Sequence, residues 1–198
     1  MPRPKSTEKR LAMMRAAIGL FLKNGYSEVS MTQISTAAGI SKSALYSHFP
    51  NKAALFMAVI KAFWAKGSVP QVDVNDTRDV SVVLKEFSHD VIGFLSKKQT
   101  INFFKTIVME SSRFDEIASA ITDNNSGPMI SGLRDYFSAQ HNKSPEKADQ
   151  AARYFLAMLR EDPFWRVIAR LREPYTEEER ESHINNVVEF VVRLLGNI

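Results

Sequence analysis

Residues 30–55 read SMTQISTAAGISKSALYSHFPNKAAL, and this stretch decides the fold. Two short helical segments, Met31–Ala38 and Lys42–His48, meet there at Gly39. Glycine adopts the left-handed backbone that a tight helix end requires, so Gly39 predicts a sharp turn. A short helix, a glycine turn and a second short helix are typical of a helix-turn-helix. The same hairpin also occurs in helical domains that do not bind DNA.

Both helices of this hairpin have polar residues suited to begin them. Ser30 is a predicted N-cap, and Gln33 stands three residues later, where a capping box has Glu or Gln. Ser41 is the predicted N-cap of the second helix. The small side chains of Ala37 and Ala38 predict that the two helices cross closely.

The outward face of the second helix is small, polar or aromatic, and it carries no acid. A helix in the major groove needs donors for base edges and phosphates and must avoid negative charge. We therefore expect Lys42, Ser43 and Tyr46 nearest the DNA, with flanking residues on phosphates. The predicted DNA-binding residues are Thr32, Ser41, Lys42, Ser43, Tyr46, His48 and Lys52.

This stretch resembles the DNA-binding domain of the TetR family of transcriptional regulators. The matching residues are Ile34, Ala38, Gly39, Ser41, Leu45, Tyr46, His48, Phe49, Lys52 and Leu55. The chain departs from the family pattern at Ser35, where alanine is usual, and at Ser43, where glycine is common. The resemblance implies an N-terminal DNA-binding domain, a C-terminal ligand-binding and dimerisation domain, and repression.

Residues 104–168 resemble the C-terminal domain of AefR-like TetR regulators. The shared features are Glu110 followed by Arg113-Phe114, a helix opening at Gly127-Pro128, and an F-L-x-x-L-R pattern at residues 155–160. From the residues themselves, Glu110 could face a cationic ligand or pair with the nearby arginine three positions later.

Composition restricts the class of protein. The 198 residues are 44% apolar, with eight Gly, eight Pro and no Cys, which favours a soluble all-α protein without disulfides or thiolate metal sites. Residues 1–66 contain ten Lys and Arg but only two Glu, a net charge of +8, whereas the whole chain carries +4. A basic first third and a remainder of −4 predict polyanion binding by the first part. The basic N-terminus lacks the apolar run of a signal peptide, so we expect a cytoplasmic protein.

The predicted fold is all-α, with an N-terminal three-helix helix-turn-helix domain, residues 1–66, joined to a C-terminal ligand-binding and dimerisation domain, residues 67–198. Gly67–Asp76 is the predicted linker. We expect a flexible arm or a frayed end at residues 2–6. Further helices are predicted at residues 7–24, 51–65, 77–97, 99–111, 114–124, 127–141, 145–161, 163–172 and 176–195. The inward stripe expected for the first helix is Leu11, Met14, Ile18, Phe21 and Leu22.

The second domain is rich in aromatic and Met side chains, which line pockets for apolar ligands but also fill ordinary cores. Two polar residues among them are candidates to orient a ligand. The predicted pocket residues are Phe87, His89, Phe94, Phe103, Phe104, Glu110, Phe137, Phe155 and Met158.

The last predicted helix has an apolar stripe broader than a surface helix needs, which suggests burial by its own chain on one side and by a partner on the other. A core helix in a monomer is the alternative. The predicted dimer contacts are Ile184, Val187, Val188, Val191, Leu194 and Leu195.

No motif of an enzyme or a metal site is present. The four histidines lie on separate segments, and there is no zinc-ligand spacing, P-loop or nucleophile-elbow motif. We therefore expect no enzyme, no metal, no cofactor and no membrane partner.

Together these features predict a ligand-responsive transcriptional repressor. It would bind a palindromic operator in double-stranded DNA as a homodimer and be released by a small, largely apolar or amphipathic effector. Two alternatives remain open: a carrier of apolar ligands that does not regulate through DNA, and an architectural DNA-binding protein without a ligand. The basic first third argues against the carrier, and the aromatic second domain argues against the architectural protein.

Overall fold

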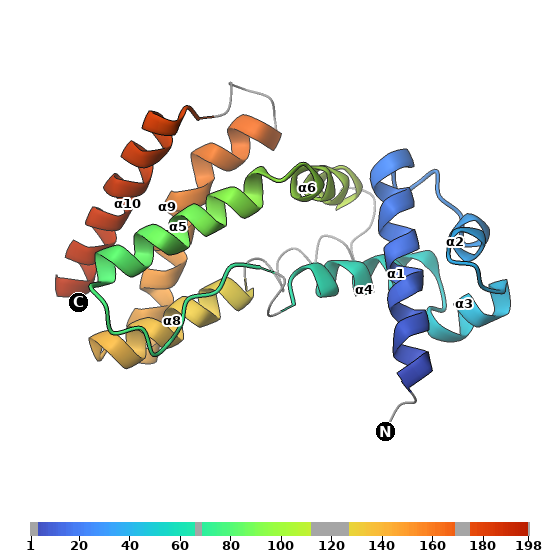
Figure 1. Ribbon diagram of the computed structural model, residues 1–198, viewed down its shortest axis with the longest axis horizontal. Helices are drawn as coiled ribbons and strands as arrows, with labels where there is room; N and C mark the ends of the chain where they lie inside the picture. Colours follow the sequence, from blue (N-terminus) through green and yellow to red (C-terminus); the bar gives the residue numbers. More distant parts are fainter. Residues whose placement is uncertain (1–3, 66–68, 112–126, 169–174, 198) are drawn as a thin grey trace. The chain divides into compact units, whose positions relative to one another are not determined.

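A computed structural model describes residues 4–65, 69–111, 127–168 and 175–197 of the chain (Figure 1). Every regular element in these residues is an α-helix, and the first four form the expected helix-turn-helix region, so the predicted fold class is confirmed. The helices are α1 (Pro4–Asn24), α2 (Met31–Ala37), α3 (Lys42–His48), α4 (Lys52–Phe63), α5 (Val80–Ser96), α6 (Lys98–Ser111), α8 (Gly127–His141), α9 (Pro145–Ile168) and α10 (Glu177–Asn197). The helix predicted at residues 114–124 lies outside the described residues.

The chain packs as two compact units. Unit 1 is Met1–Phe63 with Asn102–Asn125, and unit 2 is Trp64–Ile101 with Ser126–Ile198. Most of α6 thus belongs to unit 1, although it follows α5 of unit 2 in the chain. The functional division into residues 1–66 and 67–198 stays a prediction.

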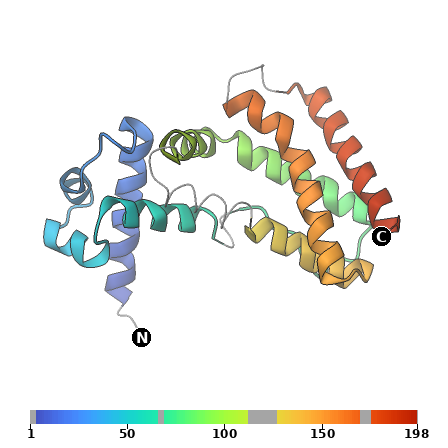
Figure 2. The same cartoon turned by 180° about the vertical axis from the view of Figure 1, so that it is seen from behind.

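In unit 1, α1 and α4 cross, and the short helices α2 and α3 lie to one side of α1 (Figures 1 and 2). Three rings hold this arrangement: the ring centroids of Phe21 and Phe56 are 5.2 Å apart, and Tyr26 lies 5.2 Å from the first and 4.8 Å from the second. Each such aromatic pair contributes about 0.5–1.5 kcal/mol beyond its burial. The rings join α1, the turn after it and α4.

The predicted face and start of α1 need correction. The fully buried residues are Met13, Ala17 and Phe21, four positions apart, whereas Leu11 is 43% exposed. Ala17 is fully buried although its side chain is small, so a pattern of large apolar residues did not include it. The helix also begins at Pro4, so part of the expected arm is helical. Proline suits the first position because its missing N–H has no intrahelical partner there.

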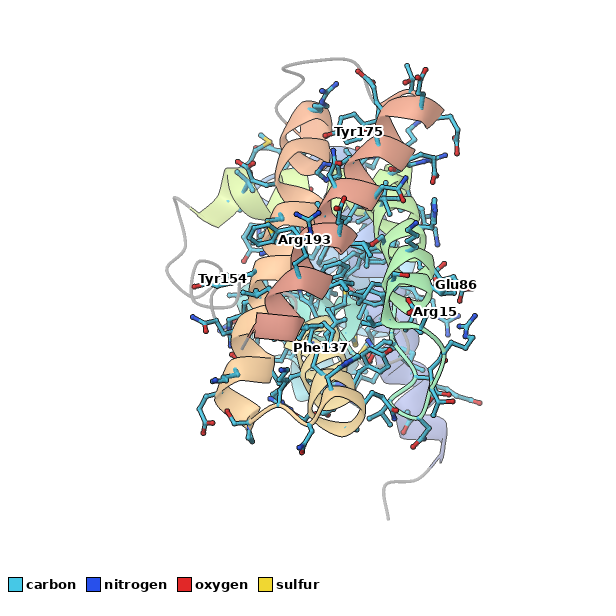
Figure 3. All side chains as sticks on the ribbon, turned by 90° about the vertical axis from the view of Figure 1, so that its left-hand side faces the viewer. Arg15, Glu86, Phe137, Tyr154, Tyr175 and Arg193 are labelled. Atoms are coloured by element: carbon cyan, nitrogen blue, oxygen red, sulfur yellow. The ribbon has the colours of Figure 1, made fainter. Side chains whose placement is uncertain are left out.

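In unit 2, α10 packs on both α5 and α9, which also contact each other (Figure 3). The buried side of α10 faces these two helices, and α8 packs on α9 after a short turn. Residues 69–79, which include most of the predicted linker, contain no helix where they are described. Asp79 ends this segment as the N-cap of α5, because its carboxylate accepts from the Ser81 N–H at 2.8 Å.

The two helices predicted at residues 145–161 and 163–172 are one helix up to Ile168, so the break expected at Pro163 is wrong. Proline has no backbone N–H, and it therefore cannot donate to the carbonyl of Leu159 four residues earlier. His183 of α10 lies 3.0 Å from that carbonyl through Nε2. Since a carbonyl only accepts, Nε2 must carry the proton. A donor from another helix thus satisfies the group that the proline leaves without its usual partner.

Candidate nucleic-acid interface

The α2–α3 hairpin is fixed by short-range hydrogen bonds at each end of α2. Ser30 and Gln33 form the predicted capping box: the Ser30 hydroxyl accepts from the Gln33 N–H at 3.2 Å, and the Gln33 side chain accepts from the Ser30 N–H at 2.7 Å. At the other end Gly39 has a φ of 64°. Its N–H donates to Thr36, and the next N–H, of Ile40, donates to the Ser35 carbonyl, which is a Schellman ending.

Ser41 begins α3, as predicted. Its hydroxyl accepts from the Ala44 N–H at 3.2 Å and lies 3.1 Å from the Ser43 hydroxyl. The helix then presents two different faces, since Leu45 is fully buried and Phe49 is 2% exposed, whereas Tyr46 is 43% exposed. The hairpin therefore holds α3 by its apolar side and leaves its polar side open.

The exposed side of α3 consists of the residues expected nearest DNA, together with Ser47. Lys42, Ser43 and Tyr46 are all exposed. Tyr46 lies one turn after the adjacent Lys42 and Ser43, so the three share one side of the helix. No acidic residue lies on α3. Thr32 on α2 is also exposed, while His48 at the end of α3 is half-buried, 6.4 Å from the Phe49 ring centroid.

Ala37 and Ala38, expected at a close crossing of α2 and α3, are not part of the buried face of α2. Ala37 is exposed and Ala38 is half-buried. The buried face of α2 is instead made by Met31, Ile34 and Ser35. The Ser35 hydroxyl can be buried because it donates to the Thr32 carbonyl at 2.8 Å.

Lys52 has a different environment from the phosphate contact that its sequence position predicted. Its ammonium donates to the carbonyls of Tyr26, Ser27 and Val29 at 2.8, 3.2 and 2.9 Å, which uses its three protons. It also lies 4.4 Å from the Tyr26 ring centroid. Partial burial lowers the pKa of Lys52, and the carboxylates of Glu110 and Glu28 act in the opposite direction. In this structure Lys52 therefore holds the turn between α1 and α2.

Arg10 is a residue of this region that the sequence patterns did not indicate. Its guanidinium carbon lies 4.3 Å from the ring centroid of Phe49, the C-cap of α3. Stacking of a guanidinium on an aromatic ring contributes about 0.5–2 kcal/mol. Arg10 thus links the end of α3 to α1, and no local spacing could have revealed a pair 39 positions apart.

The predicted pocket residues divide between the two units. Phe103, Phe104 and Glu110 belong to unit 1, where both rings lie near Phe63, with centroid distances of 4.1 and 6.1 Å. Glu110 accepts from the Ser27 hydroxyl at 3.1 Å, whereas Arg113, the alternative partner, lies outside the described residues. Phe103 and Glu110 are both buried.

The other six predicted pocket residues belong to unit 2. Phe87 and Phe155 stack with ring centroids 6.3 Å apart, and with Phe137 they are buried in the core, while Phe94 and Met158 are half-buried. His89 is exposed, and its Nε2 lies 3.4 Å from a carboxylate oxygen of Glu181. A histidine in that position does not line a buried apolar site.

The predicted dimer contacts also need correction. Ile184, Val187, Val188, Val191 and Leu195 are at most 7% exposed within one chain, and Leu194 is half-buried, because this stripe faces α5 and α9. Residues buried by their own chain cannot supply a partner surface. Among the side chains of these helices that the structure describes, the exposed aromatic ones are Phe190 on α10, at 54%, and Tyr154 on α9, at 49%, the latter labelled in Figure 3.

Two buried polar atoms of α8 have no hydrogen-bond partner among the described residues, Tyr136 Oη and His141 Nε2. The two rings lie 5.8 Å apart, edge to face. Burial is the main cause that raises the pKa of Tyr136, and Asp76 and Asp79 add to it. Burial is also the main cause that lowers the pKa of His141; Lys143 adds to this, and Asp79 opposes it. Burial thus favours the neutral form of both groups.

Within the described ranges, no three His, Asp or Glu side chains come together in a way that could hold a metal ion. The described helices also include none with the length and apolarity needed to cross a bilayer.

Comparison with known proteins assigns the chain to a family. Residues 13–59 match the bacterial regulatory proteins of the tetR family, and residues 82–196, more than half of the chain, match the C-terminal domain of AefR-like transcriptional repressors. The chain therefore belongs to the TetR family of transcriptional regulators. Both predicted resemblances are confirmed, and with them the expectation of a DNA-binding regulator rather than an enzyme.

Individual curated relatives match over shorter stretches. The nucleoid occlusion factor SlmA of Alteromonas mediterranea is 27% identical over 103 residues, which cover 51% of this chain and 52% of that protein. The transcriptional repressor BepR of Brucella suis is 34% identical over 56 residues, which cover 28% of this chain and 27% of that protein. The chain thus spans about half the length, or less, of the curated relatives that it matches.

Solved structures match over nearly the whole chain. A TetR-family regulator from Mesorhizobium loti has a TM-score of 0.79 at 22% identity and covers 98% of both chains. The flavonoid-responsive regulator FrrA has a TM-score of 0.75 at 28% identity, covering 94% of this chain and 96% of that one. The order of helices described above is therefore the fold of the family.

Proposed function

We propose that this chain is a ligand-responsive repressor that acts in the cytoplasm and binds a palindromic operator as a homodimer. The observation that carries the proposal is the two-faced α3: Lys42, Ser43 and Tyr46 are exposed on the helix that Leu45 and Phe49 anchor. The hairpin lies in the segment that carries a net charge of +8. Positive charge supplies affinity for the phosphate backbone, and the exposed side chains of α3 supply contacts to base edges.

A dimer would present α3 twice. Two recognition helices fit successive major grooves when they lie about 34–36 Å apart, and the two-fold symmetry of the protein requires a palindromic site. The proposed partner surface is the outer side of α9 and α10. Its support is the exposure of Tyr154 and Phe190, since large exposed aromatic side chains are enriched at protein interfaces.

The proposed effector is a small, largely apolar molecule bound within the C-terminal half. The stacked rings of Phe87 and Phe155 in unit 2 support this, and both are candidates to contact the effector. FrrA is described as flavonoid-responsive, which favours a planar aromatic effector here. The effector would release DNA only if it binds the DNA-incompetent state more tightly than the DNA-binding state. A difference of about 3 kcal/mol between the two binding free energies shifts the ratio of the two populations more than a hundredfold.

Selection from random-sequence duplexes, followed by fluorescence anisotropy at several salt concentrations, tests the DNA-binding part. We expect Lys42→Gln to weaken binding to the selected operator about tenfold. It should also reduce the slope of log binding constant against log salt concentration by about 1. Lys61→Gln, which removes the same charge from an exposed site on α4, is the matched control and should change the affinity less than about twofold. Equal losses for the two variants, or no salt-dependent binding by the wild type, would contradict the proposal.

Thermal unfolding with a panel of flavonoids and of aliphatic acids tests the effector. The proposal expects one class to raise the unfolding temperature and to weaken operator binding. The second candidate function, a DNA-binding protein without a ligand, is favoured by the similarity to a nucleoid occlusion factor. It expects operator binding that none of these compounds changes. A carrier expects the opposite, with a thermal shift but no salt-dependent affinity for any duplex.

A further inference from the structure

Glu110 is the one charged side chain among the described residues that is buried, at 5% exposed. It lies near the end of α6, in the part of that helix that belongs to unit 1. Its Oε2 accepts from the Ser27 hydroxyl at 3.1 Å, although the two residues are 83 positions apart in the chain. A buried carboxylate is costly to desolvate, so its neighbours must compensate for its charge.

The compensating cation beside this pair is Lys52. Its ammonium donates to the Ser27 carbonyl at 3.2 Å, so Ser27 is held by Lys52 through its backbone and by Glu110 through its side chain. Electrostatic attraction between Glu110 and Lys52 acts across the same turn. The carbonyl of Tyr26, the residue before Ser27, also accepts a hydrogen bond from the Lys52 ammonium at 2.8 Å.

This turn directly precedes the recognition hairpin. Ser30, the N-cap of α2, comes three residues after Ser27, and the Val29 carbonyl accepts the third Lys52 proton at 2.9 Å. The backbone of residues 26–29 therefore determines where α2 begins, and the Schellman ending of α2 determines where α3 begins. A group that fixes the turn fixes the position of α3 within unit 1.

We propose that Glu110 is a positioning residue for DNA binding, which acts through the Ser27 hydroxyl and the Lys52 ammonium to hold the α1–α2 turn and hence α3. The inference rests on the proposed function, because it presumes that α3 binds DNA. It assigns to a residue of α6 a role in DNA recognition without contact to DNA. It also replaces the ligand-facing role that the sequence suggested for Glu110.

The test compares two carboxylates beside the same lysine. Glu110→Gln keeps the size of the side chain and an acceptor for Ser27 but removes the charge. Glu28→Gln removes the same charge from an exposed position that also acts on Lys52. Simple electrostatics expects both changes to tighten binding to DNA slightly, since each removes a negative charge from a DNA-binding unit. The positioning role instead expects Glu110→Gln to weaken DNA binding and Glu28→Gln to leave it nearly unchanged.

Binding is measured by fluorescence anisotropy with full-length protein, a duplex selected by the wild type and a scrambled duplex of the same composition. We expect Glu110→Gln to weaken the selected duplex about tenfold while binding to the scrambled duplex changes less than about twofold. Glu28→Gln should leave the selected duplex within about twofold of the wild type. A loss of general stability would not separate the selected from the scrambled duplex in this way.

Ser27→Ala provides a second variant that removes only an exposed hydroxyl and should fold normally. It should weaken binding to the selected duplex about fivefold. The double variant with Glu110→Gln should lose less affinity than the product of the two single losses, because both substitutions act through one contact. If Glu110→Gln proves unstable at the assay temperature, Ser27→Ala alone decides. Wild-type affinity in Glu110→Gln or Ser27→Ala, or equal loss in Glu28→Gln, overturns the inference while DNA binding stands. Failure of the wild type to select any duplex overturns the proposed function itself.

Discussion

The α2–α3 hairpin and the α9–α10 pair are both pairs of helices, but they are stabilised in different ways. The hairpin has helices of 7 residues each, and their ends are defined by Ser30, Gly39 and Ser41, which act on immediate neighbours. In the α9–α10 pair the helices have 24 and 21 residues, and they meet where His183 donates to the Leu159 carbonyl, 24 positions away.

The difference follows from helix length. A helix of two turns has few internal hydrogen bonds, so most of its N–H and C=O groups need caps. A long helix has enough internal bonds and packing to continue through a proline when another helix supplies the missing donor. Local signals should therefore control the hairpin, and contacts between distant residues should control α9 and α10. Four experiments test this comparison.

The largest change in stability is expected on the buried side of α3. Leu45→Ala removes a fully buried side chain and should lower the free energy of unfolding by about 2–5 kcal/mol. Its neighbour Tyr46 is 43% exposed, so Tyr46→Ala should change that free energy by less than about 0.5 kcal/mol. Urea unfolding followed by circular dichroism measures both. Similar losses would mean that α3 does not have one buried and one open face.

The next effect concerns the α9–α10 contact. His183→Phe keeps a ring beside Tyr175, whose centroid lies 5.4 Å away, but it removes the donor to Leu159. Leaving a buried carbonyl without a partner should cost about 1–3 kcal/mol.

Pro163→Ala is the matched background for this change. It restores an N–H that can donate to the Leu159 carbonyl within α9, so His183→Phe should then cost little. The same cost of His183→Phe in both backgrounds, in a double-mutant cycle of unfolding free energies, would show that the histidine does not compensate for the proline.

A glycine-to-alanine substitution should change the stability in opposite directions at two positions. Gly39 has a φ of 64°, and Gly39→Ala should destabilise the protein by about 1–2 kcal/mol because a Cβ is strained in that conformation. Gly19 lies inside α1 with open space where a Cβ would lie, so Gly19→Ala should stabilise by about 0.5–1 kcal/mol. Thermal unfolding decides the signs. Stabilisation by Gly39→Ala would exclude the left-handed turn between α2 and α3.

The smallest effect is a pH dependence that originates in unit 2. Burial, aided by Lys143 and opposed by Asp79, lowers the pKa of His141 below its ordinary value of 6.5. Between the lowered pKa of the folded state and the ordinary pKa of the unfolded state, the unfolded chain binds more protons than the folded one. The contribution of His141 to the free energy of unfolding is therefore fully present above about pH 6.5 and is lost as the pH falls through the folded-state pKa. His141→Phe should reduce the slope of the unfolding free energy against pH in that range. An unchanged slope in this variant would assign the dependence to other groups.

Much of the hairpin could be predicted from its own residues. The capping box at Ser30, the turn at Gly39 and the N-cap at Ser41 each depend on atoms within five positions, and all three occur as expected. The role of Lys52 was not predictable, because its three carbonyl partners lie more than twenty positions earlier. Sequence position suggested a phosphate contact, and folding placed the ammonium on the turn.

In unit 2, two predictions from sequence patterns differ from the structure. A proline at position 163 predicts the end of a helix, yet α9 continues because His183 supplies a donor. The apolar stripe of α10 predicted a partner chain, yet five of its six members are buried by α5 and α9. Periodicity indicates which side of a helix is buried, but it does not indicate by what.

The sequence by itself determined the class of fold, the recognition hairpin and the family, because caps, glycine turns and charge act over a few residues or over the whole composition. The tertiary structure decided which apolar stripe of α1 is buried, that α9 continues past its proline, and that Glu110 meets Ser27. These outcomes depend on pairs of residues brought together from distant parts of the chain, and no spacing within a segment encodes such a pair.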